Sequence, residues 1–303
     1  MRHGTKMELD IRPGKYVIAV SGGVDSMVLL DMLARNTAII DGYRLVVAHF
    51  DHGMRSNSDE DRQFVQRAAN QYGLPFVYNR VELGARASEA QARSARYTFL
   101  QRVQAAVRAD AIITAHHKDD VLETAVLNLL RGTGRRGLSS LHHNPNVVRP
   151  LLNTTKADIY SYARQRQLAW VEDETNQDQR YRRNFVRQSI IPKFSSHQHQ
   201  QLHQHIAAAH QLNHDIEVLI SELLDNEHAP HLLKRMKCIH LPHIVSKELV
   251  ASWLRRNQVR DFEKHTIERL TIAIKTAAPG TKHHIKAGAH IFMQPNGLVR
   301  LVQ

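Results

Sequence analysis

The sequence predicts an α/β fold, in which a parallel sheet covered by helices is followed by a smaller, mostly helical α+β region. Three observations lead to this prediction. Short apolar runs rich in β-branched residues alternate with helical stretches through the first half of the chain. The pattern then changes to long amphipathic helices and one hairpin, and hydrophobic residues make up 42% of the 303 residues, enough for a core in each region. Strands that alternate with helices in this way build parallel sheets with right-handed crossovers.

The first half is expected to contain alternating strands and helices. The strands are predicted from short apolar runs, and the helices from apolar residues at helical spacing. The strands are expected at Tyr16–Val20, Leu45–Ala48, Phe76–Tyr78 and Ala111–Ala115. The helices are expected from Val24 onward, from near Ser58, over Ala87–Val107 and over Lys118–Leu130.

The second half begins with a long amphipathic helix, predicted over residues 197–225. Two further helices and a β-hairpin are expected after it, the hairpin because Asn-Gly separates two alternating apolar runs. These elements are predicted at Lys247–Arg256, Phe262–Thr276, Ala289–Met293 and Leu298–Val302. The domain boundary is placed near residues 195–210, which gives a first domain of residues 1–200 and a second of residues 201–303.

The charge of the chain indicates a polyanionic partner. Lys and Arg number 41 against 29 Asp and Glu, a formal net charge of +12, and 21 histidines add positive charge at acidic pH. Nucleic acid is the first candidate and an acidic membrane surface the second. A compositional bias without a polyanionic partner is the alternative.

The single cysteine, Cys238, excludes several chemistries. An intrachain disulfide, a Cys-rich zinc site and a dithiol redox pair all need at least two thiols. No apolar run reaches the roughly 18 residues of a membrane helix, and the N-terminus lacks the apolar stretch of a signal peptide. We therefore expect a protein of the cytoplasm with no membrane partner.

Polar clusters follow three of the predicted strands, at Ser21–Ser26, His49–Arg55 and His116–Glu123. Ligands of parallel sheets bind at the carboxyl ends of the strands. The first half is therefore predicted to be a catalytic domain.

The Ser21–Ser26 cluster, Ser-Gly-Gly-Val-Asp-Ser, lies between a predicted strand and a predicted helix. Its glycines permit a tight turn, and backbone N–H groups together with the positive end of the helix suit a phosphate. The loop lacks the Gly-Lys-Ser/Thr of a Walker A motif and the spacing of a dinucleotide-binding fingerprint.

These residues carry a resemblance to a known family. Ser21–Ser26 resembles the SGGxDS signature of the PP-loop ATP pyrophosphatases, whose fold is Rossmann-like (adenine nucleotide alpha hydrolase-like). Further segments, in order, resemble the tRNA(Ile)-lysidine synthetases within that superfamily. They are Ala48–Arg55, Arg93–Tyr97, Thr114–Thr124 continuing into Leu130–Gly134, Arg149–Leu152, Glu172–Asn176 and Arg183–Arg187. Val121 departs from the Gln usual in the family, but the acidic residues around it remain.

The resemblance implies ATP-dependent ligation of free L-lysine to carbon 2 of the first anticodon cytidine of a CAU-bearing tRNA(Ile). An adenylated cytidine would be the intermediate, and AMP and pyrophosphate the by-products. Two sets of residues are carried over. The expected ATP-binding residues are Ser21, Gly22, Gly23, Val24, Asp25, Ser26, His52 and Arg55. The expected catalytic residues are Asp25, Arg93, His116, Asp119, Asp120, Glu123 and Arg183.

The acidic residues of the His116–Glu123 cluster have more than one interpretation. Asp119 and Glu123 share a helix face, and with Asp120 they could clamp the lysine ammonium, hold Mg, or do both. Asp25, Asp119 and Glu123 are the predicted Mg ligands. An acidic first turn stabilised only by the helix dipole is the structural alternative. His116 is predicted to donate to a leaving oxygen or to act as an acid.

Basic segments indicate where tRNA would bind. Residues 180–193 contain five Arg and Lys and no acidic residue, and residues 231–275 contain ten against four Asp and Glu. Simple solvated helix faces are the alternative. The histidines between residues 197 and 214 include two i,i+4 pairs, a spacing that can bind zinc, but no Cys or carboxylate supports such a site.

Three rival functions remain at this stage. A tRNA thiolase of the same superfamily usually needs paired cysteines, and a small-molecule amide synthetase would not need the basic runs. A non-enzymatic RNA-binding protein would leave the phosphate loop without a role. The sequence does not fix the oligomeric state, and a homodimer is one alternative.

Overall fold

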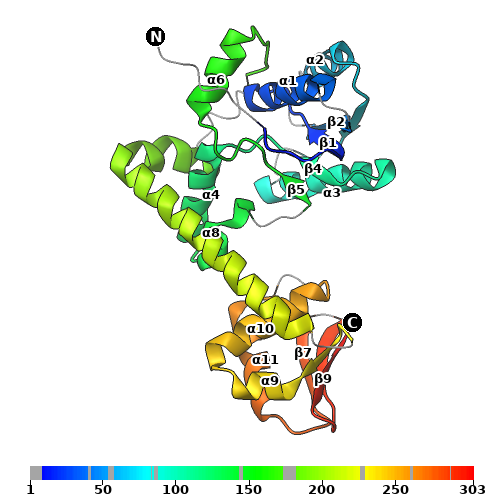
Figure 1. Cartoon of the computed structure of the whole chain (residues 1–303), viewed down its shortest axis with the longest axis vertical. Helices are drawn as coiled ribbons and strands as arrows, with labels where there is room; N and C mark the ends of the chain where they lie inside the picture. The colour runs from blue at the N-terminus through cyan, green and yellow to red at the C-terminus, as the bar shows by residue number, and fades with distance from the viewer. Residues whose placement is uncertain are drawn as a thin grey trace. The chain divides into compact units, whose positions relative to one another are not determined.

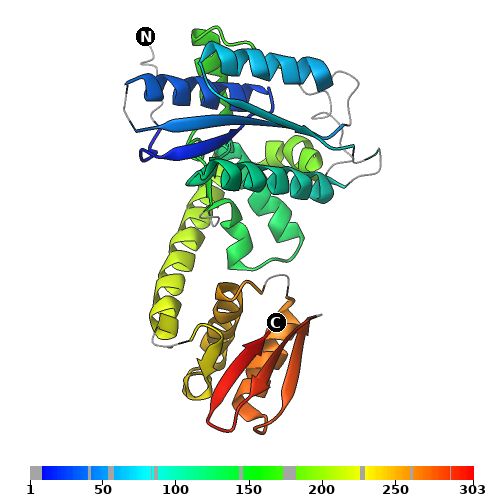
Figure 2. The same ribbon diagram turned by 90° about the vertical axis from the view of Figure 1, so that its right-hand side faces the viewer.

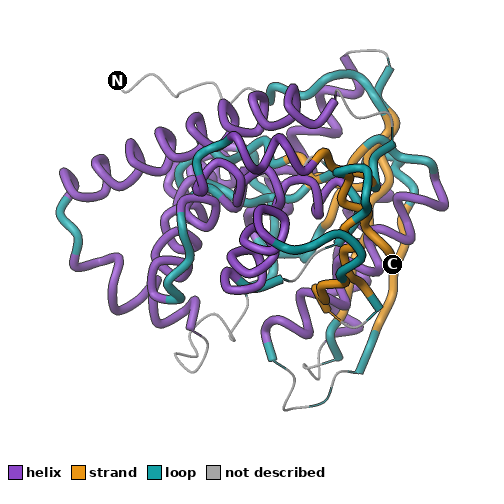
Figure 3. The backbone as a smooth tube through the Cα atoms, turned by 90° about the horizontal axis from the view of Figure 1, so that it is seen from below, coloured by secondary structure: helices purple, strands orange, loops and turns teal. Residues whose placement is uncertain are grey.

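The structure is a computed structural model that describes residues 9–39, 42–53, 58–82, 84, 88–142, 146–172, 182–225, 229–259, 262–286 and 288–303. The chain divides into two compact units, residues 1–210 and 211–303. Helix α8 (Ser196–Asp225) continues through this division. Figure 1 shows the order of the elements, and Figure 3 shows that helix predominates and that the strands gather into sheets.

The first unit is built on a five-stranded parallel sheet, as the alternating pattern predicts. Its order is β3-β2-β1-β4-β5. The chain therefore adds β2 and β3 on one side of β1, and then β4 and β5 on the other side of β1. The strands are β1 (Lys15–Ala19), β2 (Arg44–Asp51), β3 (Phe76–Arg80), β4 (Ala111–Ile113) and β5 (Val147–Val148). The fifth strand was not predicted, because two residues are too few to show an alternating pattern.

Helices cover both faces of this sheet (Figure 2). Adjacent residues on each central strand enter different cores: Ile18 packs with the helices of one face, whereas Val17 packs with α3 on the other. The first core includes α1 (Val24–Ile39), α2 (Ser58–Gln71) and α6 (Lys156–Gln165). Because both faces are buried, the strands are almost continuously apolar, as expected for parallel sheets.

The helix predicted over Ala87–Val107 is α3, described from Glu89 to Val107. Ser88 is its N-cap, because the Ser88 hydroxyl accepts the N–H of Gln91 and the Gln91 side chain accepts the N–H of Ser88. The predicted strand Ala111–Ala115 ends earlier, at Ile113. Its last two residues belong instead to the loop that leads into α4 (Lys118–Leu130).

Shorter elements connect α4 to α8. They are α5 (Arg135–Leu138), η1 (Ser140–His142), α7 (Arg182–Phe185), the π-helical turn η3 (Val186–Ile190) and η4 (Ile191–Lys193). In the described part of the chain, no helix is both long and apolar enough to cross a membrane.

The second unit combines helices with a four-stranded antiparallel sheet of order β6-β9-β8-β7. The predicted hairpin is present as β8 (Ala289–Met293) and β9 (Leu298–Val302). The other elements are β6 (Leu232–Lys234), α9 (Arg235–His240), α10 (His243–Arg256), α11 (Lys264–Thr276) and β7 (Lys282–Lys286). β7 was not predicted, because Ile285 is its single apolar residue and one apolar residue shows no alternation in the sequence.

Candidate active site

The loop after β1 is held by the hydroxyl groups of its two serines. Ser26 Oγ accepts the N–H groups of Ser21 and Gly22 at 3.2 Å and donates to Gly23 O at 2.9 Å. Gly22 has φ +96°, a conformation that a side chain would strain. The N–H of Gly23 lies 3.4 Å from Ser21 Oγ. The N–H groups of Gly22 and Gly23, which the sequence predicted to face a phosphate, donate to serine hydroxyls in this structure. The Val24 side chain lies in the core.

Asp25 follows this loop in the first turn of α1 and contacts a residue far away in the sequence. Lys156 Nζ donates to Asp25 Oδ1 at 2.6 Å. The two side chains retain 35% and 30% of their exposure, so neither is sealed in the protein. Lys156 is the first residue of α6, and no motif in the sequence pointed to it.

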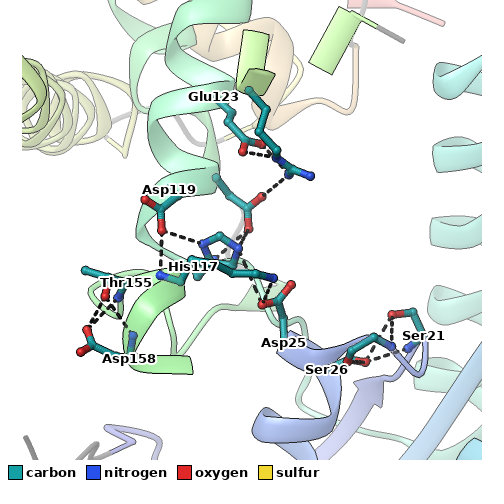
Figure 4. Close-up of polar contacts among 12 residues, drawn as sticks. Ser21, Asp25, Ser26, His117, Asp119, Glu123, Thr155 and Asp158 are labelled. Atoms are coloured by element: carbon teal, nitrogen blue, oxygen red, sulfur yellow. Dashed lines mark hydrogen bonds and ion pairs between the residues drawn. The ribbon is translucent and has the colours of Figure 1, made fainter. Parts of the chain in front are cut away.

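Asp119, in the first turn of α4, joins this helix to α6. Its Oδ2 accepts the backbone N–H of Lys156 at 2.8 Å. His117, directly before α4, lies between the carboxylates, with Nε2 3.8 Å from Asp25 and Nδ1 3.4 Å from Asp119 (Figure 4). The N-terminal turns of α1, α4 and α6 therefore meet at one place.

This meeting point lies where the strand order of the sheet reverses. α1 follows β1 and the loop to α4 follows β4, and these two strands are neighbours. A crevice at such a switch point is where open parallel sheets bind ligands. Three helix N-termini together concentrate positive potential, which favours an anion.

The histidines here have opposite protonation behaviour. Burial lowers the pKa of His117, but the carboxylates of Asp119, Asp120 and Asp25 raise it, and the net shift is upward. Contact with His117 and the donated N–H of Lys156 lower the pKa of Asp119 to about 2. Burial lowers the pKa of His116 to about 3.

His116 is consequently neutral near pH 7, and its Nδ1 is 2.8 Å from Thr114 Oγ1. A neutral imidazole suits the predicted hydrogen bond to a leaving oxygen, and the role of His116 as an acid stays a prediction. His117 is the histidine that lies among the carboxylates, which the sequence alone could not decide.

Asp120 and Glu123 lie further along α4 and are bound by two arginines. Arg183 donates through Nη2 to Asp120 at 2.7 Å and through Nε to Glu123 at 2.9 Å. Arg187 donates through Nε and Nη2 to the two oxygens of Glu123, at 2.5 and 2.8 Å. Arg183 belongs to α7 and Arg187 to the π-helical turn after it, a type of turn frequent at functional sites.

The predicted Mg ligands do not form one group. Glu123 is saturated by guanidinium groups with 3% of its side chain exposed, whereas Asp25 and Asp119 face Lys156 and His117. Among the residues that the structure describes, no three His, Cys, Asp or Glu side chains come together as a metal-binding group. This applies equally to the histidines of α8. One of them, His199, instead has its Nε2 3.1 Å from Ile191 O.

The remaining predicted residues have other surroundings. Arg93 is exposed and its guanidinium lies 4.9 Å from the centre of the Tyr97 ring, with no described contact to the carboxylates. His52 packs edge-on to Phe50, and burial lowers its pKa. Arg55 lies outside the described residues.

The Ser21–Ser26 loop, the strand order and the three helix N-termini together define the class of this protein, an α/β domain that binds phosphate groups. The chain belongs to the PP-loop domain family, which matches residues 5–194. Within it, the chain is 35% identical over 253 residues to the tRNA(Ile)-lysidine synthase of Haemophilus ducreyi, covering 79% of this chain and 57% of that protein. It is 45% identical over 182 residues to the tRNA(Ile)-lysidine synthase of Thermus thermophilus, covering 58% and 35%. The chain thus spans about half the length of the curated relatives it matches, or less.

The fold resembles that of a solved U34-tRNA thiolase, NcsA from Methanococcus maripaludis. The TM-score is 0.54 at 14% identity, over 67% of this chain and 73% of that one. At this identity the likeness concerns the fold alone.

Proposed function

We propose that the protein ligates free lysine to carbon 2 of the first anticodon cytidine of a CAU-bearing tRNA(Ile), which changes codon reading from AUG to AUA. The observation that carries the proposal is the meeting of three helix N-termini at the Ser21–Ser26 loop, in a chain similar to lysidine synthases. This geometry suits a polyphosphate, so ATP is the proposed co-substrate.

In the proposed reaction the carbonyl oxygen on carbon 2 attacks the α-phosphorus of ATP, and pyrophosphate leaves. The ε-amine of lysine then attacks carbon 2, the amine loses a proton, and AMP leaves. Ser21–Ser26 and the first turn of α1 would hold the pyrophosphate. His52 and Arg55 remain proposals for contacts to ATP, and Arg93 remains a proposal for a catalytic residue. His116, being neutral, would donate a hydrogen bond to a leaving oxygen.

The donors around the loop fit Mg in part. Mg usually takes one or two carboxylates together with phosphate oxygens and water. Asp25 and Asp119 are partly exposed and could serve, whereas Glu123 is enclosed by Arg183 and Arg187. Bound Mg would neutralise charge on the phosphates.

The lysine substrate would be held by the acidic residues of α4. Asp120 and Glu123 already bind cationic groups, which supports their affinity for an ammonium. We propose that the lysine ε-ammonium displaces part of the guanidinium contact there. His117 lies among three carboxylates that raise its pKa, and in its neutral form it would accept the proton that the amine must lose.

The basic segments would bind tRNA. Within residues 182–193, Arg182 is exposed and Phe185 keeps 46% of its exposure, a combination suited to a phosphate and a stacked base. Residues 1–200 are proposed as the catalytic domain and 201–303 as a tRNA-binding domain. Such a substrate places the proposed activity in the cytoplasm.

A tRNA thiolase is the alternative function, and the surroundings of Cys238 do not favour it. This thiol is fully buried in the second unit, and burial raises its pKa to about 12, so it is neither accessible nor ionised.

The test is to incubate the protein with ATP, Mg, labelled lysine and a CAU-anticodon tRNA(Ile) transcript. Label is expected in the RNA. Folded protein that transfers no label would overturn the proposal, and activity with a sulfur donor would favour the thiolase.

A further inference from the structure

Lys156 occupies a position that is electrostatically unfavourable for a cation. It is the first residue of α6, where the helix dipole places partial positive charge. The N-terminal turns of α1 and α4 add to the same potential, since both are joined to this residue by hydrogen bonds. A lysine here needs negative charge close by, and Asp25 supplies it at 2.6 Å.

The backbone around Lys156 is fixed by hydrogen bonds, whereas its ammonium contacts side chains, Asp25 at 2.6 Å and the Tyr160 ring at 5.2 Å from the ring centre. The backbone N–H of Lys156 donates to Asp119, and the preceding Thr155 forms a capping box with Asp158 (Figure 4). α6 is also tied to α1, because Tyr162 Oη donates to the buried Asp31 at 2.7 Å. The Cα of Lys156 is therefore fixed relative to the phosphate loop, and a flexible four-carbon stem carries the charge.

The ammonium lies beside the segment that would hold the phosphates. Asp25 directly precedes Ser26, whose hydroxyl organises the loop. Lys156 retains 35% exposure and can leave Asp25 without unfolding α6. Both side chains of this pair stay in contact with solvent, so another anion can replace Asp25 as the partner of the ammonium.

We propose that Lys156 is a phosphate-binding residue of the nucleotide site. Its pairing with Asp25 keeps the ammonium at the loop in the absence of nucleotide, and a phosphate oxygen of bound ATP takes over as its partner. The inference rests on the proposed use of ATP and adds α6 to the nucleotide site.

Equilibrium binding to the full chain tests this role with two probes, Mg-ATP and adenosine. Lys156→Met removes the charge but keeps the length of the side chain. We expect it to weaken ATP binding at least about tenfold, as for loss of one charge-assisted hydrogen bond, and to leave adenosine binding within about twofold. Lys156→Arg should restore ATP binding to within about threefold of wild type. Arg164→Met, which removes a cation from the exposed end of the same helix, should change neither.

Two outcomes would overturn the assignment. Equal losses for ATP and adenosine would mean that Lys156 only supports the structure, and unchanged ATP binding would mean that it makes no phosphate contact. If Lys156→Met does not fold, Lys156→Gln gives the same comparison of the two probes. The result is independent of the ligation assay: selective loss of ATP binding supports Lys156 even if wild-type protein transfers no lysine.

Discussion

Arg183 Nε lies 2.9 Å from Glu123 Oε2, across 60 residues of sequence. The Glu123 side chain is 3% exposed and Arg187 binds it as well. The two guanidinium groups together neutralise Glu123, and Arg183 also donates to Asp120. This pairing fixes the segment that carries the basic run against α4.

Arg183→Met is expected to destabilise the protein by about 1.5–3 kcal/mol, because Asp120 loses its hydrogen-bonded cation and Glu123 keeps only Arg187. Urea unfolding measures the loss. Arg182→Met, at the exposed neighbouring position, should change the free energy of unfolding by less than about 0.5 kcal/mol. Equal effects of the two substitutions would show that the ion pair does not stabilise this segment.

Tyr162→Phe removes a hydroxyl donor to Asp31, whose side chain is 1% exposed and also accepts from Tyr72 and Arg35. We expect a loss of about 1–3 kcal/mol, because a buried charged acceptor loses one of its hydrogen bonds. Tyr160→Phe on the same helix keeps its ring contact with Trp170 and is the matched control. A loss no larger than that of the control would contradict the proposed anchoring of α6 to α1.

The pair of His117 and Asp119 predicts how stability depends on pH. The raised pKa of His117 stabilises the fold fully below about pH 6.5, and this contribution disappears as the pH rises through the folded pKa. The lowered pKa of Asp119 stabilises the fold above its ordinary value of 3.8, and this is lost as the pH falls towards about 2.

Asp119→Asn should therefore lower the pKa of His117 and remove part of the acid-side loss of stability. NMR titration of the His117 ring and urea unfolding at several pH values measure the two effects. An unchanged His117 pKa in Asp119→Asn would show that this carboxylate does not hold the imidazolium.

Asp25→Ala should reduce AMP formation at least about 100-fold, because the charge that orients Lys156 and any bound metal is removed at the loop. tRNA retention on filters should stay near the wild-type level, since the basic segments are untouched. If tRNA binding fell in parallel, the assignment of Asp25 to the ATP site would be wrong.

The affinity for tRNA should fall steeply with salt. Each phosphate contact releases counterions, so the logarithm of the association constant falls linearly with the logarithm of salt concentration. Arg182→Ala should reduce this slope by about one, whereas Arg164→Ala should leave it unchanged. A slope near zero for wild type would exclude an electrostatic tRNA interface.

The sequence by itself determined the parallel α/β fold, the phosphate loop and the family, because these depend on local periodicity and on residues adjacent in the chain. Ser21–Ser26 and the run from His116 to Glu123 could be placed at strand ends without coordinates. The short strands β5 and β6 could not be predicted from the sequence, because two or three residues are too few to show an alternation of apolar and polar residues.

Only the tertiary structure decided which charges pair. Asp119 and Glu123 share a helix face, yet one meets Lys156 and the other Arg183 and Arg187. His116 and His117 are adjacent, yet burial lowers the pKa of one and surrounding carboxylates raise that of the other. Lys156 belongs to no motif and reaches Asp25 across 131 residues. Charge pairing depends on distance and burial in space, and spacing along the chain does not contain either.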